Sequence, residues 1–249
     1  MTQTGTWKPP APPGAVRRPG LEEAAELWWR REVDDRTLQR AGRRWTAWTL
    51  AVVVVFTAPG IGLLLLSPWT LPVALGCFAH AWIVPWLQAR RGARSVVPLG
   101  GERGAGRGSG TDGAAEGVAL GLLGDLVGHR VRELVGTSGL AMHRGKLGVW
   151  LVGQRGALMV RRGGRRVDCW CVRVAESGDL PAGDRVAHLL LALREDEAGF
   201  AMVANLGFSG AAWRVRRGLA ESARPALDAA RSAARSASRR GAFAISGTP

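Results

Sequence analysis

The 249-residue sequence has no tyrosine, three cysteines and only two lysines, Lys8 and Lys146. Cys77, Cys169 and Cys171 form an odd number, and the last two are too close in sequence for an ordinary disulfide framework. Such cysteine usage argues against a disulfide-stapled secreted domain and favours a reducing compartment. Because lysine is nearly absent, the net charge of +14 comes from arginine. Enrichment in Arg, Ala, Gly and Val is typical of a high-GC genome, so part of this basicity reflects codon usage rather than a partner.

Charge is missing altogether from two long stretches, Trp45–Leu66 and Trp69–Gln88, which contain no Lys, Arg, Asp or Glu. Roughly 20 apolar helical residues cross the hydrocarbon core of a bilayer. Residues 45–88 are therefore predicted to form an α-helical transmembrane hairpin, which places the protein in a bacterial plasma membrane. The first 44 residues are Pro-rich and then charged, unlike a cleavable signal peptide, so the first span is expected to act as its own insertion signal.

Arginines flank both ends of this hairpin, whereas its Ser67-Pro68 turn is uncharged. The flanking residues are Arg40, Arg43 and Arg44 before the first span and Arg90, Arg91 and Arg94 after the second. Arginine next to a span resists translocation, so both termini are predicted to be cytoplasmic. Tryptophans stand where the headgroup levels are expected, at Trp45 and Trp48, at Trp69 in the turn, and at Trp82 and Trp86 near the exit. An indole ring prefers that interface, which supports the register.

Three features inside the spans modify a plain helical hairpin. Pro59 removes a backbone donor and predicts a kink in the first helix. Ala58 and Gly62, four residues apart, can let the second helix approach closely. His80 is ionisable, and such groups within a membrane are functional candidates. The alternative is a neutral imidazole that hydrogen-bonds across the hairpin, because a lone histidine makes a poor proton relay and two helices enclose no pore without a homo-oligomer.

Composition divides the rest of the chain into segments. Residues 1–20 hold five prolines and predict a disordered arm, and 21–44 carry a charged amphipathic juxtamembrane helix. Residues 89–117 form a Gly/Arg-rich linker, since Gly100–Gly117 contains eight glycines in 18 residues. Residues 118–240 are long enough for one small cytoplasmic domain, and 241–249 form a disordered tail.

Within residues 118–240 the pattern predicts a small α+β domain. Apolar spacing favours a helix over 118–135, and period-two runs favour a β-meander of 147–152, 157–161 and 167–174, widened by a strand near 140–143. Asp184 is expected to cap a helix that ends near Glu197, and 210–219 and 225–240 are expected to be helical. The last helix carries an arginine face, which fits either anionic lipid or a solvated surface over docked alanines.

The sequence contains only weak matches to metal-binding and catalytic motifs. Cys169 and Cys171 lie two apart on a predicted strand and therefore on one face, where His129, His143 or His188 could join them around a metal. Paired small residues of a core explain the same spacing better. Gly139–Lys146 differs from a phosphate loop in length and in Leu147, and Gly207–Ala211 lacks the second glycine of a nucleophile elbow. We expect no enzyme activity and no cofactor.

Three segments carry a resemblance beyond composition. They are Arg43-Arg44-Trp45-Thr46-Ala47-Trp48, Leu122-Leu123-Gly124-Asp125-Leu126 and Asp184-Arg185-Val186-Ala187-His188-Leu189-Leu190. Together with the Arg-rich, Lys-poor usage, the chain from about residue 25 to 230 resembles uncharacterised two-span membrane proteins of actinomycetes. The resemblance implies a lineage, but neither an activity nor functional residues.

Three functions from different classes fit these observations. The first is a membrane-anchored cytoplasmic interaction or adaptor domain, whose partners are the lipid bilayer and an unidentified protein. The second is a basic domain that binds nucleic acid or ribosomes at the membrane, because the residues after Gln88 carry an excess of +11, although aromatic residues do not interleave with the arginines. The third is a redox or metal sensor that uses Cys169 and Cys171.

Overall fold

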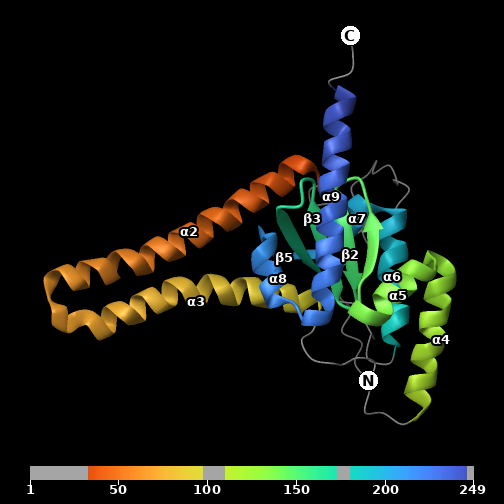
Figure 1. Cartoon of the computed structure of the whole chain (residues 1–249), viewed down its shortest axis with the longest axis horizontal. Helices are drawn as coiled ribbons and strands as arrows, with labels where there is room; N and C mark the ends of the chain where they lie inside the picture. Colours follow the sequence, from red (N-terminus) through yellow and green to blue (C-terminus); the bar gives the residue numbers. More distant parts are fainter. Residues whose placement is uncertain (1–32, 98–109, 173–179, 246–249) are drawn as a thin grey trace, which may run out of the picture.

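The computed structural model describes residues 33–97, 110–172 and 180–245. A long helical hairpin stands out from one side of a body in which helices cover a twisted sheet (Figure 1). The arm predicted for 1–20, residues 21–32 of the segment predicted for 21–44, residues 98–109 of the linker and the end of the tail lie outside the described residues.

The sheet has five antiparallel strands in the order β1-β2-β3-β4-β5. Four of them, β1 (Ala141–Arg144), β2 (Gly148–Gly153), β3 (Gly156–Arg161) and β4 (Arg166–Cys171), are consecutive. They match the meander that the period-two runs predict, including its additional first strand. Gly163 and Gly164 have positive φ angles of 85° and 70° in the β3–β4 turn, which most other residues adopt only with strain.

The fifth strand, β5 (Asn205–Ala211), pairs with β4 and was not predicted from the sequence. The helix expected over 210–219 begins two residues later, as α8 (Ala212–Gly218). Glycine and serine at 207, 209 and 210 mask the strand signal, because both residues are poor strand formers. Pairing with β4 supplies the backbone hydrogen bonds that propensity does not.

One face of the sheet is covered by α4 (Gly110–Val127), α6 (Ala182–Glu195) and α7 (Glu197–Val203), together with the start of the hairpin. The predicted helix over 118–135 is divided at Gly128, whose φ is 87°, into α4 and α5 (His129–Ser138). Pro181 rather than Asp184 stands at the N-cap position of α6, and Asp184 lies in its first turn. The backbone N–H groups of Ala182 and Gly183 donate instead to the carboxylate of Glu116. The buried side chains of this face include Trp150, Met159 and Trp170.

The other face is covered by α8, by α9 (Arg224–Ile245) and by the end of the second hairpin helix. Alanines at 226, 230 and 234 dock α9 on the sheet. Residues 241–245, predicted in a disordered tail, continue α9 as helix. Strands β2 and β3 are therefore buried on both sides, and the sheet forms the middle of three layers.

The hairpin consists of α2 (Asp35–Leu66), a 3₁₀ turn at Pro68–Thr70 and α3 (Leu71–Val96). Both long helices are apolar and long enough to cross a membrane. Residues 35–44 of the predicted juxtamembrane helix are helical and continue without a break into the first span as α2. Residues 89–96, expected in the linker, are the last turns of α3, and residues 110–117 begin α4.

Candidate functional site

The base of the hairpin is embedded in the core of the body. Ala89, Ala93 and Val96 of α3 are buried with Leu151, Leu158 and Phe208 of the sheet. On the opposite face, Leu38 of α2 is buried with residues of β2, β3 and α6. The two helices therefore enter the body on different sides of the sheet, and α2 passes along the edge strand β5. A hairpin held in this way cannot swing on a tether.

A buried ion pair holds α2 against the sheet. Arg161 at the end of β3 donates two hydrogen bonds to Asp168 of β4, at 2.5 Å and 3.1 Å. The carboxylate of Asp168 is fully buried, and the Arg161 side chain is 14% exposed. The same guanidinium donates at 2.7 Å to the backbone carbonyl of Leu38 in α2. Asp168 thus orients Arg161, and the same guanidinium group also holds the first turn of α2.

A second arginine repeats this arrangement one turn further along α2. Arg166 donates to the carbonyl of Gly42 at 2.5 Å and to Thr46 Oγ at 2.7 Å, while its Nε donates to Ser209 of β5 at 3.1 Å. Gly42 has no side chain, so the guanidinium can lie against the helix backbone. Burial lowers the pKa of Arg166, with Arg161 adding to this and Asp168 opposing it.

A third arginine binds the other helix of the hairpin. Arg214 of α8 donates to the backbone carbonyl of Pro85 in α3, and its guanidinium lies 5.4 Å from the ring centre of Phe208. Burial lowers the pKa of Arg214. We call Arg161, Arg166 and Arg214 the arginine clamp, because each joins the body to a main-chain carbonyl of the hairpin. Each of the three arginines lies 123 to 129 positions along the chain from the carbonyl group that it binds, so sequence spacing gave no signal for them.

Close packing of α3 on β5 depends on Gly92. A Cβ atom at this position would overlap the side chain of Phe208. Because interiors are close-packed, a methyl group here must displace a buried aromatic ring.

Replacing Gly92 with alanine is expected to lower the free energy of unfolding by about 1–3 kcal/mol, the usual cost of overpacking. The control is Gly76→Ala in the same helix, where no atom lies within 4 Å of the added group. Alanine favours a helix over glycine by up to about 1 kcal/mol, so the control is expected to be neutral or slightly stabilising. Denaturant unfolding of the full chain in detergent measures both. Equal effects of the two substitutions would show that α3 does not pack on β5.

The tryptophans expected at headgroup levels do not all have the same surroundings. Trp48, Trp69 and Trp82 are exposed on the hairpin. Trp45 is partly buried and lies edge-on to Phe208, with ring centres 5.5 Å apart, so it belongs to the packing of the body. Trp86 is partly buried, stacked on Trp82 and covered by Arg90.

Within the hairpin, α2 continues through Pro59, which is exposed. The close approach of the helices occurs at Gly60 against Phe78, whereas Gly62 has open space around it. His80 is exposed, and its Nδ1 lies 2.7 Å from the Gly76 carbonyl of its own helix. Its ring stacks on Phe56 of the other helix at 5.5 Å. The contact across the hairpin is therefore ring stacking, not the hydrogen bond considered from the sequence.

The flanking arginines gather at the base of the hairpin. Arg40, Arg43, Arg44 and Arg91 are exposed, whereas Arg90 and Arg94 are partly buried. All flank the uncharged stretch 45–88, near the start of α2 and the end of α3.

The structure does not bring the candidate metal ligands together. Cys169 is buried on the face of α3 and α9, and burial raises the pKa of its thiol well above the ordinary value. Cys171 donates to Ser95 Oγ of α3 at 2.8 Å. His188 is exposed on α6, which covers the opposite face of the sheet. Among the residues that the structure describes, no three His, Cys, Asp or Glu side chains are grouped for a metal ion.

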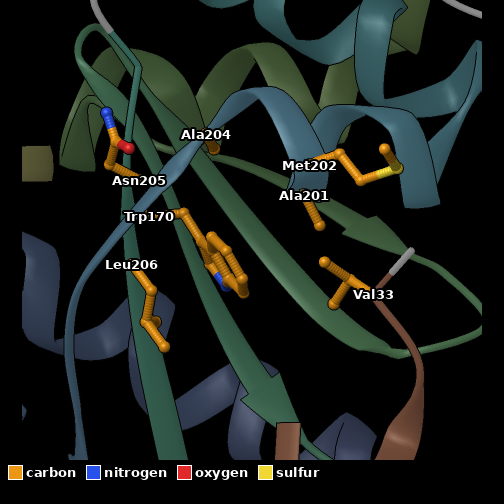
Figure 2. A pocket seen from close by; sticks show the side chains of 7 residues that line it. All are labelled: Val33, Trp170, Ala201, Met202, Ala204, Asn205 and Leu206. Atoms are coloured by element: carbon orange, nitrogen blue, oxygen red, sulfur yellow. The ribbon is translucent and has the colours of Figure 1, made fainter. Parts of the chain in front are cut away.

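A cavity of about 330 Å³ lies between α7 and the end of the sheet, and none of the predicted site residues lines it (Figure 2). It is lined by Val33, Trp170, Ala201, Met202, Ala204, Asn205 and Leu206. The indole Nε1 of Trp170 is buried and has no hydrogen-bond partner among the described residues. The lining is otherwise mostly apolar, and nothing in the sequence marked these residues as a group.

No family model matches the chain, and neither a curated protein nor a solved structure shows significant similarity to it.

Proposed function

We propose that this chain is a two-span membrane protein whose α+β body is held at the cytoplasmic surface of a bacterial plasma membrane to bind a protein partner. One observation carries the proposal. In each hairpin helix, only 11% of an apolar stretch of 18 residues is buried inside the protein. The core helix of a soluble protein hides such a surface, whereas here the side chains of Leu50, Val54, Leu65 and Leu71 point outward.

The body supports the proposed orientation. Arginines 40, 43, 44 and 91 are exposed where the hairpin joins the body, and the tip at Pro68–Thr70 carries none. Arginine next to a span favours the cytoplasmic side. We therefore expect the body, which adjoins these residues, to lie in the cytoplasm as well. Both termini then lie inside the cell.

A partner surface is available on α4 and α6, at the end of the body opposite the hairpin (Figure 1). Val118 and Leu122, one turn apart on α4, are exposed, and so is Leu191 of the adjacent helix α6. Exposed apolar side chains on neighbouring helices favour protein binding. Because the arginine clamp fixes the hairpin, this surface would face the cytoplasm in a constant direction rather than move on a tether.

The contacts that five arginines make within the protein argue against the nucleic-acid alternative. Arg161, Arg166 and Arg214 bind carbonyls or Asp168, and Arg216 and Arg231 bind Asp228. These cations are therefore committed to internal partners and contribute little to a phosphate-binding surface.

Membrane insertion and orientation can be tested together. We expect the full chain to stay with the lipid during extraction at alkaline pH, and its body to be cleaved by added protease only in inverted vesicles. Right-side-out vesicles are expected to protect the body, because only the tip at Pro68–Thr70 faces outward. Release by alkali would contradict insertion, and cleavage of the body in right-side-out vesicles would contradict the orientation.

A further inference from the structure

The short helix α8 runs beside α3 where that helix leaves the apolar part of the hairpin (Figure 1). Near its start, Arg214 binds the carbonyl of Pro85. At its end, Gly218 lies against the backbone of Arg90, since a Cβ on Gly218 would be 3.1 Å from Arg90 Cα. The start of α8 therefore contacts α3 at Pro85, and its end contacts α3 one turn nearer the body, at Arg90.

Each helix presents a tryptophan followed four residues later by an arginine. On α3, the guanidinium of Arg90 lies 4.8 Å from the ring centre of Trp86, which stacks on Trp82 at 6.2 Å. On α8, Arg217 lies 5.0 Å from the ring centre of Trp213. Four residues of helix rise about 6 Å. On both helices the tryptophan thus comes before the arginine, counted from the apolar part of the hairpin toward the body.

This order matches the layers of a membrane surface. Indole rings prefer the level between hydrocarbon and headgroups, and a guanidinium group binds phosphate through paired N–H donors. A cation over a ring face keeps its N–H edges available for such bonds. Trp213 is exposed although it is large and apolar, and its position on the body leaves it outside the hairpin itself.

The other two arginines of α8 have partners within the protein. Arg214 is bound to α3, and Arg216 donates to Asp228 at 3.0 Å. On α9, where the sequence suggested a lipid-binding arginine face, Arg231 donates to the carbonyl of Gly164 and to Asp228. Among the described residues, the guanidinium of Arg217 contacts only the ring of Trp213.

We propose that α8 is a membrane-surface element, in which Trp213 enters the headgroup layer and Arg217, with Arg90, binds the phosphate of an anionic phospholipid. The proposal rests on the proposed insertion of the hairpin, which sets the level of the bilayer. It places the anionic-lipid contact on α8 instead of α9.

The test uses the full chain in vesicles of phosphatidylcholine and phosphatidylglycerol, with the lipids that remain bound after detergent release counted by native mass spectrometry. Arg217→Gln is expected to retain about fivefold less phosphatidylglycerol than the wild type, because one basic residue close to an anionic surface strengthens lipid binding by about this factor. Arg217→Lys is expected to fall between them, because lysine keeps the charge and loses the paired donors. Since Arg217 is exposed, folding is expected to be unaffected, and circular dichroism checks this.

The matched control is Arg235→Gln on α9, an exposed arginine that undergoes the same change of charge. It is expected to retain as much phosphatidylglycerol as the wild type. Equal retention by wild type and Arg217→Gln, or an equal loss in Arg235→Gln, would overturn the proposal. Failure of the proposed function is distinguishable, because the wild-type chain itself would then leave the vesicles during alkaline extraction.

Discussion

Replacing Asp168 with asparagine is expected to lower the free energy of unfolding by about 3–5 kcal/mol, the cost of leaving a buried charge without its partner. Asp168 is fully buried, and it accepts two hydrogen bonds from Arg161. Asparagine has nearly the same shape but no charge, so the guanidinium of Arg161 stays in the interior uncompensated. Arg166, whose pKa Asp168 raises, loses the same counter-charge.

The chain contains a matched control for this substitution. Asp228 also accepts from arginines, Arg216 and Arg231, but its side chain is 42% exposed. Exposed ion pairs are worth about 0–1 kcal/mol, so Asp228→Asn is expected to cost no more than that. Denaturant unfolding of the full chain in detergent measures both variants. Combining Asp168→Asn with Arg161→Met is expected to recover part of the loss, because the uncompensated cation is then removed.

Loss of Asp168 is also expected to loosen the start of the hairpin. The guanidinium group of Arg161 binds both Asp168 and the carbonyl of Leu38, so we expect its bond to Leu38 to weaken when the carboxylate is removed. Faster amide exchange over residues 35–42 in Asp168→Asn, at unchanged exchange in α9, would show that the ion pair fixes α2. Equal costs for Asp168→Asn and Asp228→Asn, or unchanged exchange over 35–42, would contradict this role of the pair.

Sequence patterns were informative where the structure is local. The meander was predicted because β2, β3 and β4 combine apolar, strand-forming residues with glycine turns. The long apolar helices were predicted because residues 45–88 contain no charge. In both cases the decisive signal lies within about twenty residues, which is the range over which periodicity can be read.

The join between hairpin and body was not predictable in this way. Residues 89–96 were assigned to the linker because Ala89, Gly92 and Ala93 are too small to make a hydrophobic stripe. Their small side chains, however, allow α3 to approach the sheet closely. The contacts of the arginine clamp join residues 123 or more positions apart, such as Leu38 and Arg161. Every residue has a main-chain carbonyl, so a guanidinium group that binds one leaves no recognisable motif in the sequence.

Placing an arginine at Val55 is expected to oppose insertion of the hairpin by about 2.5–3.5 kcal/mol, the cost of a positive charge near the centre of a transmembrane helix. Val55 is 63% exposed, so the substitution removes almost no packing within the protein. The control is Val118→Arg on α4 of the body, at a valine that is 64% exposed. If lipid surrounds the hairpin, Val55→Arg lowers the alkali-resistant fraction of the chain, whereas Val118→Arg leaves it unchanged. If water surrounds both valines, the two substitutions have the same small effect, and the hairpin is then not a membrane element. The comparison thus distinguishes an apolar surface that contacts lipid from one that is exposed to water.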